Sequence, residues 1–151
     1  MKKIMFVCHG NICRSPMAEF VFLDMLRKQG LSEEITAMSS ATSTEEIGND
    51  IHPGTKAILS KYCIPFTKRE AVQLTRLDYA KYDLFVGMDS ANVRNMHRIF
   101  GVDPDKKIIK LLDLTGHSRD VADPWYTGDF QATYRDVTEG CAALLEKLAS
   151  E

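Results

Sequence analysis

The chain has 151 residues, of which 44% are hydrophobic and 26% are charged, and its formal net charge is −2. This length suits one domain with one core, predicted to span residues 1–151, and the composition excludes an intrinsically disordered protein. The nearly balanced charge provides no overall attraction to nucleic acid or to an anionic membrane, so neither is expected as a partner.

The N-terminus and the cysteine content indicate a reducing compartment. The apolar run after Met1-Lys2-Lys3 is too short for a signal peptide, and no cleavage site follows it. No stretch approaches the length of a membrane-spanning helix, so a cytoplasmic location is expected. The four cysteines, Cys8, Cys13, Cys63 and Cys141, are too few and too scattered for a disulfide scaffold. Cys63 and Cys141 have apolar helical neighbours and are expected to be buried.

Short apolar runs alternate with helical patterns along the chain. A strand is predicted at residues 4–7, and a helix begins at Ser15-Pro16, with Ser15 as its cap, and ends at Gly30. There follow a strand at 35–40, a helix from Pro53, a strand at 84–86, a helix capped by Asp89, a strand at 108–112 and a helix at 130–149. Strands separated by helices predict an α/β fold, in which helices cover both faces of a mostly parallel sheet. Ligands bind such sheets beyond the carboxyl ends of the strands.

The loop between the first strand and the first helix carries the most informative motif. It reads Cys8-His9-Gly10-Asn11-Ile12-Cys13-Arg14-Ser15-Pro16, which is a cysteine, five residues and then Arg-Ser. Such a short loop can curl so that backbone N–H groups converge on one point, where the helix N-terminus adds further donors. Gly10 and Asn11 tolerate the left-handed backbone that this curling needs. Residues 9–15 are therefore predicted to bind phosphate.

Cys8 is predicted to be a nucleophile at the base of this loop. The converging amides and Arg14, placed at the rim, favour the thiolate, which can attack phosphorus in line with a leaving group. Arg14 can donate two hydrogen bonds to two phosphate oxygens, and Ser15 can donate to the sulfur. The alternative is a cysteine that merely ends a buried strand, but a motif set between a strand and a Ser-Pro helix start favours catalysis. A metal site made of Cys8, His9 and Cys13 lacks a second ligand pair, so no metal and no cofactor are expected.

A covalent phosphatase also needs a proton donor for the leaving oxygen. Asp123-Pro124-Trp125-Tyr126, after the fourth strand, contains the best candidate, because an Asp before Pro is held extended and the aromatic side chains exclude water. Spacing alone does not separate Asp123 from a simple Asp-Pro turn or from the other aspartates. These alternatives are Asp89, Asp113, Asp120 and Asp129.

The segment from Cys8 to Glu19 resembles the phosphate loop and first helix of the low-molecular-weight protein tyrosine phosphatases. Asp123-Pro124-Trp125-Tyr126 is similar to their general-acid loop, and Gln73-Leu74-Thr75 and Met88–Asn92 also match, so the resemblance covers essentially the whole chain. It implies a single-domain, three-layer α/β/α fold with a four-stranded parallel sheet and no metal. It also implies hydrolysis of protein phosphotyrosine and small aryl phosphates through a cysteinyl-phosphate intermediate, with inorganic phosphate as product, by a monomer or weak dimer.

The resemblance also implies which residues carry out the reaction. Cys8 is the nucleophile, and Arg14 binds phosphate and stabilises the transition state. Asp123 first protonates the phenolic leaving group and then takes a proton from the hydrolytic water. Trp125 and Tyr126 line the walls where a substrate ring stacks, with Trp125 standing where many members have Tyr.

Other residues are implied to support the loop. Asn11, Ser15 and Ser39 hold its shape through hydrogen bonds. Cys13 is implied to be a redox partner that forms a reversible disulfide with Cys8. His9 occupies a variable position and is expected to face solvent.

Three other functions are weighed against this one. Arsenate reductases of this fold use further cysteines past mid-chain, but none lies between Cys63 and Cys141. Protein-arginine phosphatases, the main alternative, carry Thr where Ile12 stands, and Ile suits a flat phenyl ring better than a guanidinium. A noncatalytic phosphate-binding or redox-sensing module is disfavoured because the nucleophile, the arginine and the acid are all present.

Overall fold

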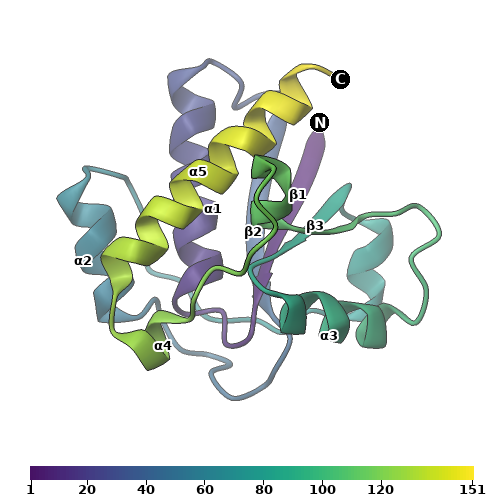
Figure 1. Cartoon of the computed structure of the whole chain (residues 1–151), viewed down its shortest axis with the longest axis horizontal. Helices are drawn as coiled ribbons and strands as arrows, with labels where there is room; N and C mark the ends of the chain where they lie inside the picture. Colours follow the sequence, from purple (N-terminus) through teal and green to yellow (C-terminus); the bar gives the residue numbers. More distant parts are fainter.

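Four parallel strands form the centre of the computed structural model, which describes residues 1–151 (Figure 1). The strands are β1 (Lys2–Cys8), β2 (Ile35–Ala41), β3 (Leu84–Gly87) and β4 (Ile108–Lys110), in the sheet order β2-β1-β3-β4. The helices are α1 (Arg14–Lys28), α2 (Pro53–Lys61), α3 (Ser90–Phe100), α4 (Pro124–Thr127) and α5 (Phe130–Ala149), with 3₁₀ turns at Arg76–Ala80 and Leu111–Thr115. None of these helices combines the length and the apolar character needed to cross a membrane.

The central strand β1 sets the three layers, because its side chains alternate between two cores. Ile4 and Phe6 belong to the core formed with α1 and α5, whereas Met5 and Val7 belong to the core formed with α3. In Figure 1, α1, α2 and α5 accordingly lie on one side of the sheet and α3 lies on the other. The predicted class, a single-domain α/β/α fold with a four-stranded parallel sheet, is confirmed.

Most element boundaries match the sequence-based prediction, and two differ. Helix α1 begins at Arg14 and has Cys13 at its N-cap without a side-chain hydrogen bond, so the prediction that Ser15 caps it is wrong. Ser15 lies inside the first turn, where its hydroxyl points to the phosphate loop instead. The fourth strand ends at Lys110, and Leu111 and Leu112 lie in a 3₁₀ turn. Both leucines are fully buried there, which explains why their pattern resembles a strand.

The two cysteines outside the loop differ in their environment. Cys141 is buried in α5, as predicted. Cys63 is exposed, so the prediction that it is buried is wrong. It follows the end of α2 with a φ of 57°, in the left-handed conformation that commonly terminates a helix. At this point the chain leaves the apolar face of α2, so the thiol points to solvent.

Gly140 allows α5 to pack closely on the turn after β4. A Cβ at this position would lie 2.3 Å from Leu111 Cγ. We expect Gly140→Ala to destabilise the fold by about 1–3 kcal/mol, although alanine is the better helix former, because overpacking outweighs helix propensity. Urea denaturation measures this change.

A double-mutant cycle provides the control for this prediction. In a Leu111→Ala background the obstructing side chain is gone, so adding Gly140→Ala should cost nothing or stabilise the protein. An equal loss of stability in both backgrounds would show that the clash with Leu111 is not the cause.

Candidate active site

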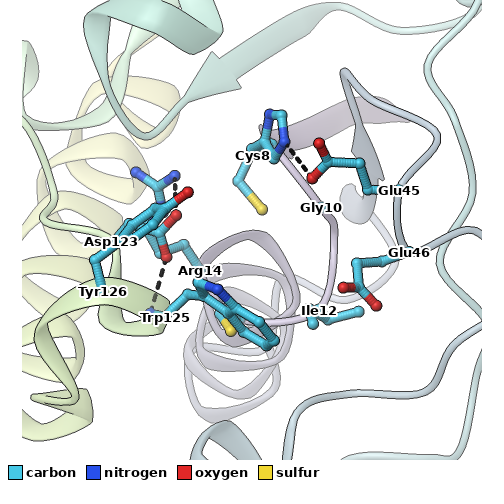
Figure 2. Close-up of a pocket in the computed structure, with 11 residues that line it drawn as sticks. Cys8, Gly10, Ile12, Arg14, Glu45, Glu46, Asp123, Trp125 and Tyr126 are labelled. Atoms are coloured by element: carbon cyan, nitrogen blue, oxygen red, sulfur yellow. Dashed lines mark hydrogen bonds and ion pairs between the residues drawn. The ribbon is translucent and has the colours of Figure 1, made fainter.

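A pocket opens beyond the carboxyl ends of the strands, where the loop after β1 leads into α1 (Figure 2). The segment after β2 forms one side of the pocket, and α4 with the residue before it forms the other. The pocket has a volume of about 100 Å³. The residues that line it are Cys8, His9, Gly10, Ile12, Cys13, Arg14, Glu45, Glu46, Asp123, Trp125 and Tyr126.

The backbone of the loop presents a set of unpaired hydrogen-bond donors. The N–H groups of residues 9, 10 and 12–15 donate to no acceptor within the protein. The last two of these belong to the first turn of α1, where the helix dipole adds positive potential. Buried backbone donors are almost always satisfied, so this loop is built to receive an external acceptor. An anion at a loop that leads into a helix N-terminus fits that requirement.

The sulfur of Cys8 lies within this ring of donors. The Asn11 N–H donates to Cys8 Sγ at 3.3 Å, and Ser15 Oγ lies 3.0 Å from the same sulfur. The Asn11 side-chain amide donates to Ser15 Oγ at 2.8 Å, so the serine hydroxyl hydrogen is available to donate to the sulfur. Both contacts stabilise negative charge on Cys8.

Asn11 ties the loop to the sheet as well as to the sulfur. Its φ of 59° is left-handed, as predicted, whereas Gly10 does not adopt a positive φ, contrary to the prediction. The Asn11 side-chain amide also donates to Ser39 Oγ at 2.9 Å, and its oxygen accepts from the Val72 N–H at 3.1 Å. The structure thus brings together Asn11, Ser15 and Ser39, the three side chains implied to support the loop.

Arg14 is buried beneath the pocket rather than placed at its rim, which corrects the sequence-based expectation. Its side chain is only 3% exposed, and its Nη1 donates to Asp89 Oδ2 at 2.7 Å and to the Val121 carbonyl at 2.9 Å. Asp89 Oδ1 accepts from the Asn92 N–H at 2.7 Å and caps α3. Asp89 therefore connects the orientation of the guanidinium to the start of a helix.

Asp123 faces the same guanidinium from the opposite side. Its backbone is extended before Pro124, its Oδ1 accepts from the Trp125 N–H at 3.0 Å, and its Oδ2 lies 3.4 Å from Arg14 Nη2. Of the five candidate aspartates, only Asp123 lines the pocket. The other four, Asp89, Asp113, Asp120 and Asp129, lie outside its lining. Position in the fold thus separates residues that spacing could not separate.

An aromatic wall borders the pocket next to Asp123. Trp125 and Tyr126 are 57% and 83% exposed, so a ligand can reach both rings. Trp125 meets the His52 ring edge to face at 5.8 Å, and His52 stacks on Phe130 at 5.0 Å. The His52 ring also accepts the Gly54 N–H at 2.9 Å, so the wall is fixed to the first turn of α2.

The other wall is acidic. Glu45 pairs with His9 Nε2 at 2.8 Å, and His9 is exposed, as expected (Figure 2). Glu46 accepts from the Asn49 side-chain amide at 2.6 Å, and its Cγ lies 3.2 Å from where a Cβ on Gly10 would be. The missing side chain of Gly10 therefore leaves room for Glu46, and Gly10 does not serve a left-handed turn.

Cys13 shares the pocket with Cys8 but differs in its chemistry. Burial, reinforced by the negative charge of Cys8 and of Asp123, raises the pKa of the Cys13 thiol to about 12. Cys13 is therefore a protonated thiol at neutral pH, which makes it a poor nucleophile. No cluster of three or more His, Cys, Asp or Glu side chains that could hold a metal ion occurs in the structure.

Sequence reasoning missed two charged residues beneath the loop. Glu19 accepts from Ser39 Oγ at 2.5 Å, and Arg69 donates to the Asn11 carbonyl. An acidic residue in the first helix next to apolar neighbours is a signal that could have identified Glu19. Arg69 lies in an irregular segment with no periodic pattern, so no sequence signal identifies it. The second role of Asp89 was also missed, although Asp89 follows a buried strand at the binding edge.

The environments of the thiols predict their order of reaction. At pH 7.5 we expect iodoacetamide to modify the exposed Cys63 at least about a hundredfold faster than Cys13 or Cys141, because burial raises the pKa of the Cys13 and Cys141 thiols. Peptide mass spectrometry measures the three rates, with urea-unfolded protein as the control in which they become similar. Labelling of native Cys13 as fast as Cys63 would contradict the prediction.

Comparison with known proteins agrees with this geometry. The family model of the low molecular weight phosphotyrosine protein phosphatases matches residues 3–151. The low molecular weight protein-tyrosine-phosphatase YfkJ of Bacillus subtilis is 38% identical over 100% of this chain and 98% of its own length. Its crystal structure superposes with a TM-score of 0.96 over 99% of this chain and 96% of that chain.

Two further relatives agree. The crystal structure of SP-PTP, a low molecular weight protein tyrosine phosphatase from Streptococcus pyogenes, is 43% identical with a TM-score of 0.89, over 98% of this chain and 93% of that one. The human low molecular weight phosphotyrosine protein phosphatase is 36% identical over 97% of this chain and 95% of its own length. The chain therefore belongs to the low molecular weight protein-tyrosine-phosphatase family.

Proposed function

We propose that this chain hydrolyses protein phosphotyrosine and small aryl phosphates through a cysteinyl-phosphate intermediate. The observation that carries the proposal is the Cys8 sulfur, which accepts hydrogen bonds at the centre of a loop whose remaining N–H groups are unpaired. A phosphate dianion provides three equatorial oxygens for those donors while the sulfur faces phosphorus. Family membership supports the same activity.

In the first step, the Cys8 thiolate attacks phosphorus, the S–P bond forms and the P–O bond to the phenol breaks. Arg14 Nη1 is engaged by Asp89 and Val121, so Nε, which has no acceptor within the protein, and Nη2, which has only the longer contact with Asp123, are the nitrogens that can bind two phosphate oxygens. Asp123, as the neutral acid, gives its proton to the leaving phenolic oxygen. This transfer prevents the release of a high-energy phenolate.

In the second step, water attacks the phosphorus of the thiophosphate. The Asp123 carboxylate accepts the proton of the water, the S–P bond breaks, and inorganic phosphate leaves. Ser15 donates to the departing sulfur and stabilises the thiolate that returns. Each residue thus ends the cycle in the state in which it began.

Two features of the pocket bear on the substrate. The rings of Trp125 and Tyr126, together with the apolar Ile12, suit a flat phenyl ring. The carboxylates of Glu45 and Glu46 on the opposite wall favour a cationic group, which keeps protein-arginine phosphatase as the second candidate. We favour phosphotyrosine, because Trp125, Tyr126 and Ile12 line the pocket beside the phosphate loop, whereas Glu45 is already paired with His9.

Parallel assays with phosphotyrosine and phosphoarginine peptides of the same sequence test this proposal. We expect kcat/KM for phosphotyrosine to be about tenfold higher or more, the range that a shaped apolar pocket provides. Cys8→Ser should abolish turnover of both peptides, since the hydroxyl cannot replace the thiolate. Full turnover by Cys8→Ser would exclude the covalent mechanism, and a preference for phosphoarginine would establish the second candidate.

The role of Asp123 predicts a dependence on the leaving group. Asp123→Asn should lower kcat/KM, which reports the step in which the phenol leaves, by about 10²–10⁴ with phenyl phosphates of high leaving-group pKa, and much less with p-nitrophenyl phosphate. The exposed Asp113→Asn, outside the pocket, is the matched control and should retain normal kinetics. A loss of kcat/KM that is equal for all leaving groups would argue against general-acid catalysis by Asp123.

A further inference from the structure

Arg69 lies beneath the phosphate loop and joins three parts of the chain. Its Nη2 donates to the carbonyl of Asn11, its Nη1 donates to the carbonyl of Asn49 at 3.3 Å, and its own N–H donates to Asp50 Oδ1 at 3.2 Å. It is half-buried, so these contacts are made in a partly dehydrated site. A guanidinium in a fixed position can hold two carbonyls at once, which no other side chain can do with the same geometry.

The contact with Asn11 acts on the part of the loop that faces the sulfur. The Asn11 residue directs its N–H to Cys8 Sγ, and Arg69 holds its carbonyl on the other side. That carbonyl belongs to the same peptide unit as the N–H of Ile12, which has no acceptor within the protein. Donation from a charged group to the carbonyl polarises the peptide unit and strengthens its N–H as a donor.

Arg69 also contributes charge. Burial lowers the pKa of its guanidinium, but the negative charges of Glu19, Cys8 and Asp50 oppose that effect, so all three lie close enough to interact with it. Arg14 lies on the pocket side of the same sulfur and contacts Asp89 and Asp123. Cys8 is therefore close enough to interact with both guanidinium groups.

Glu19 shares this environment with Arg69. Burial raises the pKa of Glu19, and the hydrogen bond from Ser39 together with the charge of Arg69 only partly offsets that effect. The charge of Arg69 thus favours the carboxylate form of Glu19, which accepts from Ser39. Without that positive charge, the Glu19 carboxylate would oppose a second negative charge on Cys8.

We propose that Arg69 is a positioning residue of the phosphate loop, which fixes the Asn11 carbonyl so that the neighbouring N–H groups face the anion, and which supports the Cys8 thiolate from behind. This inference rests on the proposed phosphate site, but it assigns a role to a residue outside the pocket lining. Arg69 touches neither the substrate nor the reacting atoms, so its effects must be seen in the reactivity of Cys8 and in anion affinity.

Two measurements on Arg69→Gln test the proposal. The pH midpoint of inactivation by iodoacetate reports ionisation of Cys8, and we expect it to rise by about one pH unit because a supporting positive charge is lost. The inhibition constant for inorganic phosphate should rise about tenfold, because the Ile12 N–H is no longer held and polarised. Arg14 and Cys13 also interact with Cys8, Asp123 lines the same pocket, and all three are unchanged in this variant.

Arg69→Lys separates charge from hydrogen bonding. Lysine keeps the positive charge but cannot hold two carbonyls in one plane, so the iodoacetate midpoint should return to near the wild-type value while phosphate inhibition stays weak. Arg27→Gln, at the opposite end of α1, makes the same change of charge and should alter neither quantity. Thermal unfolding of each variant identifies any loss that is due to unfolding.

The outcomes distinguish the inference from the proposed function. If Arg69→Gln keeps the wild-type pH midpoint of inactivation and the wild-type affinity for phosphate, the inference is overturned, even if the thermal stability of the variant falls. If Arg69→Gln does not fold, unchanged phosphate inhibition in Arg69→Lys would overturn it. Wild-type protein that neither binds phosphate nor reacts at Cys8 would instead refute the proposed function itself.

Discussion

The left-handed conformation of Asn11 is the constraint on which the site depends. A non-glycine residue in this conformation costs about 1–2 kcal/mol. Hydrogen bonds from Asn11 to Ser15 and Ser39 and from Val72 to Asn11, each contributing about 0.5–1.5 kcal/mol, offset that cost. The conformation is therefore over-determined. It turns the Asn11 N–H toward the Cys8 sulfur and leaves the other loop N–H groups unpaired for an anion.

The charges around Arg14 complement this backbone arrangement. A buried guanidinium is unfavourable unless it is paired, and Asp89, Asp123 and the Val121 carbonyl satisfy it here. The contact with Asp89, at 2.7 Å, is much shorter than that with Asp123, at 3.4 Å. The strong contact fixes the side chain, and the weak one can be exchanged for a phosphate oxygen without leaving Arg14 unpaired.

Much of this arrangement could be predicted from the sequence, because it depends on neighbours along the chain. The loop could be located from the spacing between Cys8 and Arg14, together with the strand before it and the helix after it. Residues 130–149 form α5 with the predicted bounds. Asp123 could not be separated from other aspartates by spacing and depended on the family resemblance. Position in three dimensions, in the lining of the pocket, is what distinguishes it.

The charged residues that sequence reasoning missed beneath the loop depend on contacts between distant segments. Arg69 meets Asn11 across an irregular loop, and Glu19 meets Ser39 between a helix and a strand. Cys63 was expected to be buried because its neighbours are apolar, but the left-handed residue after α2 turns outward. A local sequence pattern does not show where the end of a helix lies relative to the rest of the fold.

The packing of His52 between Trp125 and Phe130 has a consequence for evolution and for protein engineering. His52 does not line the pocket, yet its ring supports Trp125 while it caps α2. The orientation of the aromatic wall thus depends on a residue outside the pocket lining. Substitutions at position 52 offer a route by which ligand preference can diverge between relatives while every residue that touches the ligand stays the same.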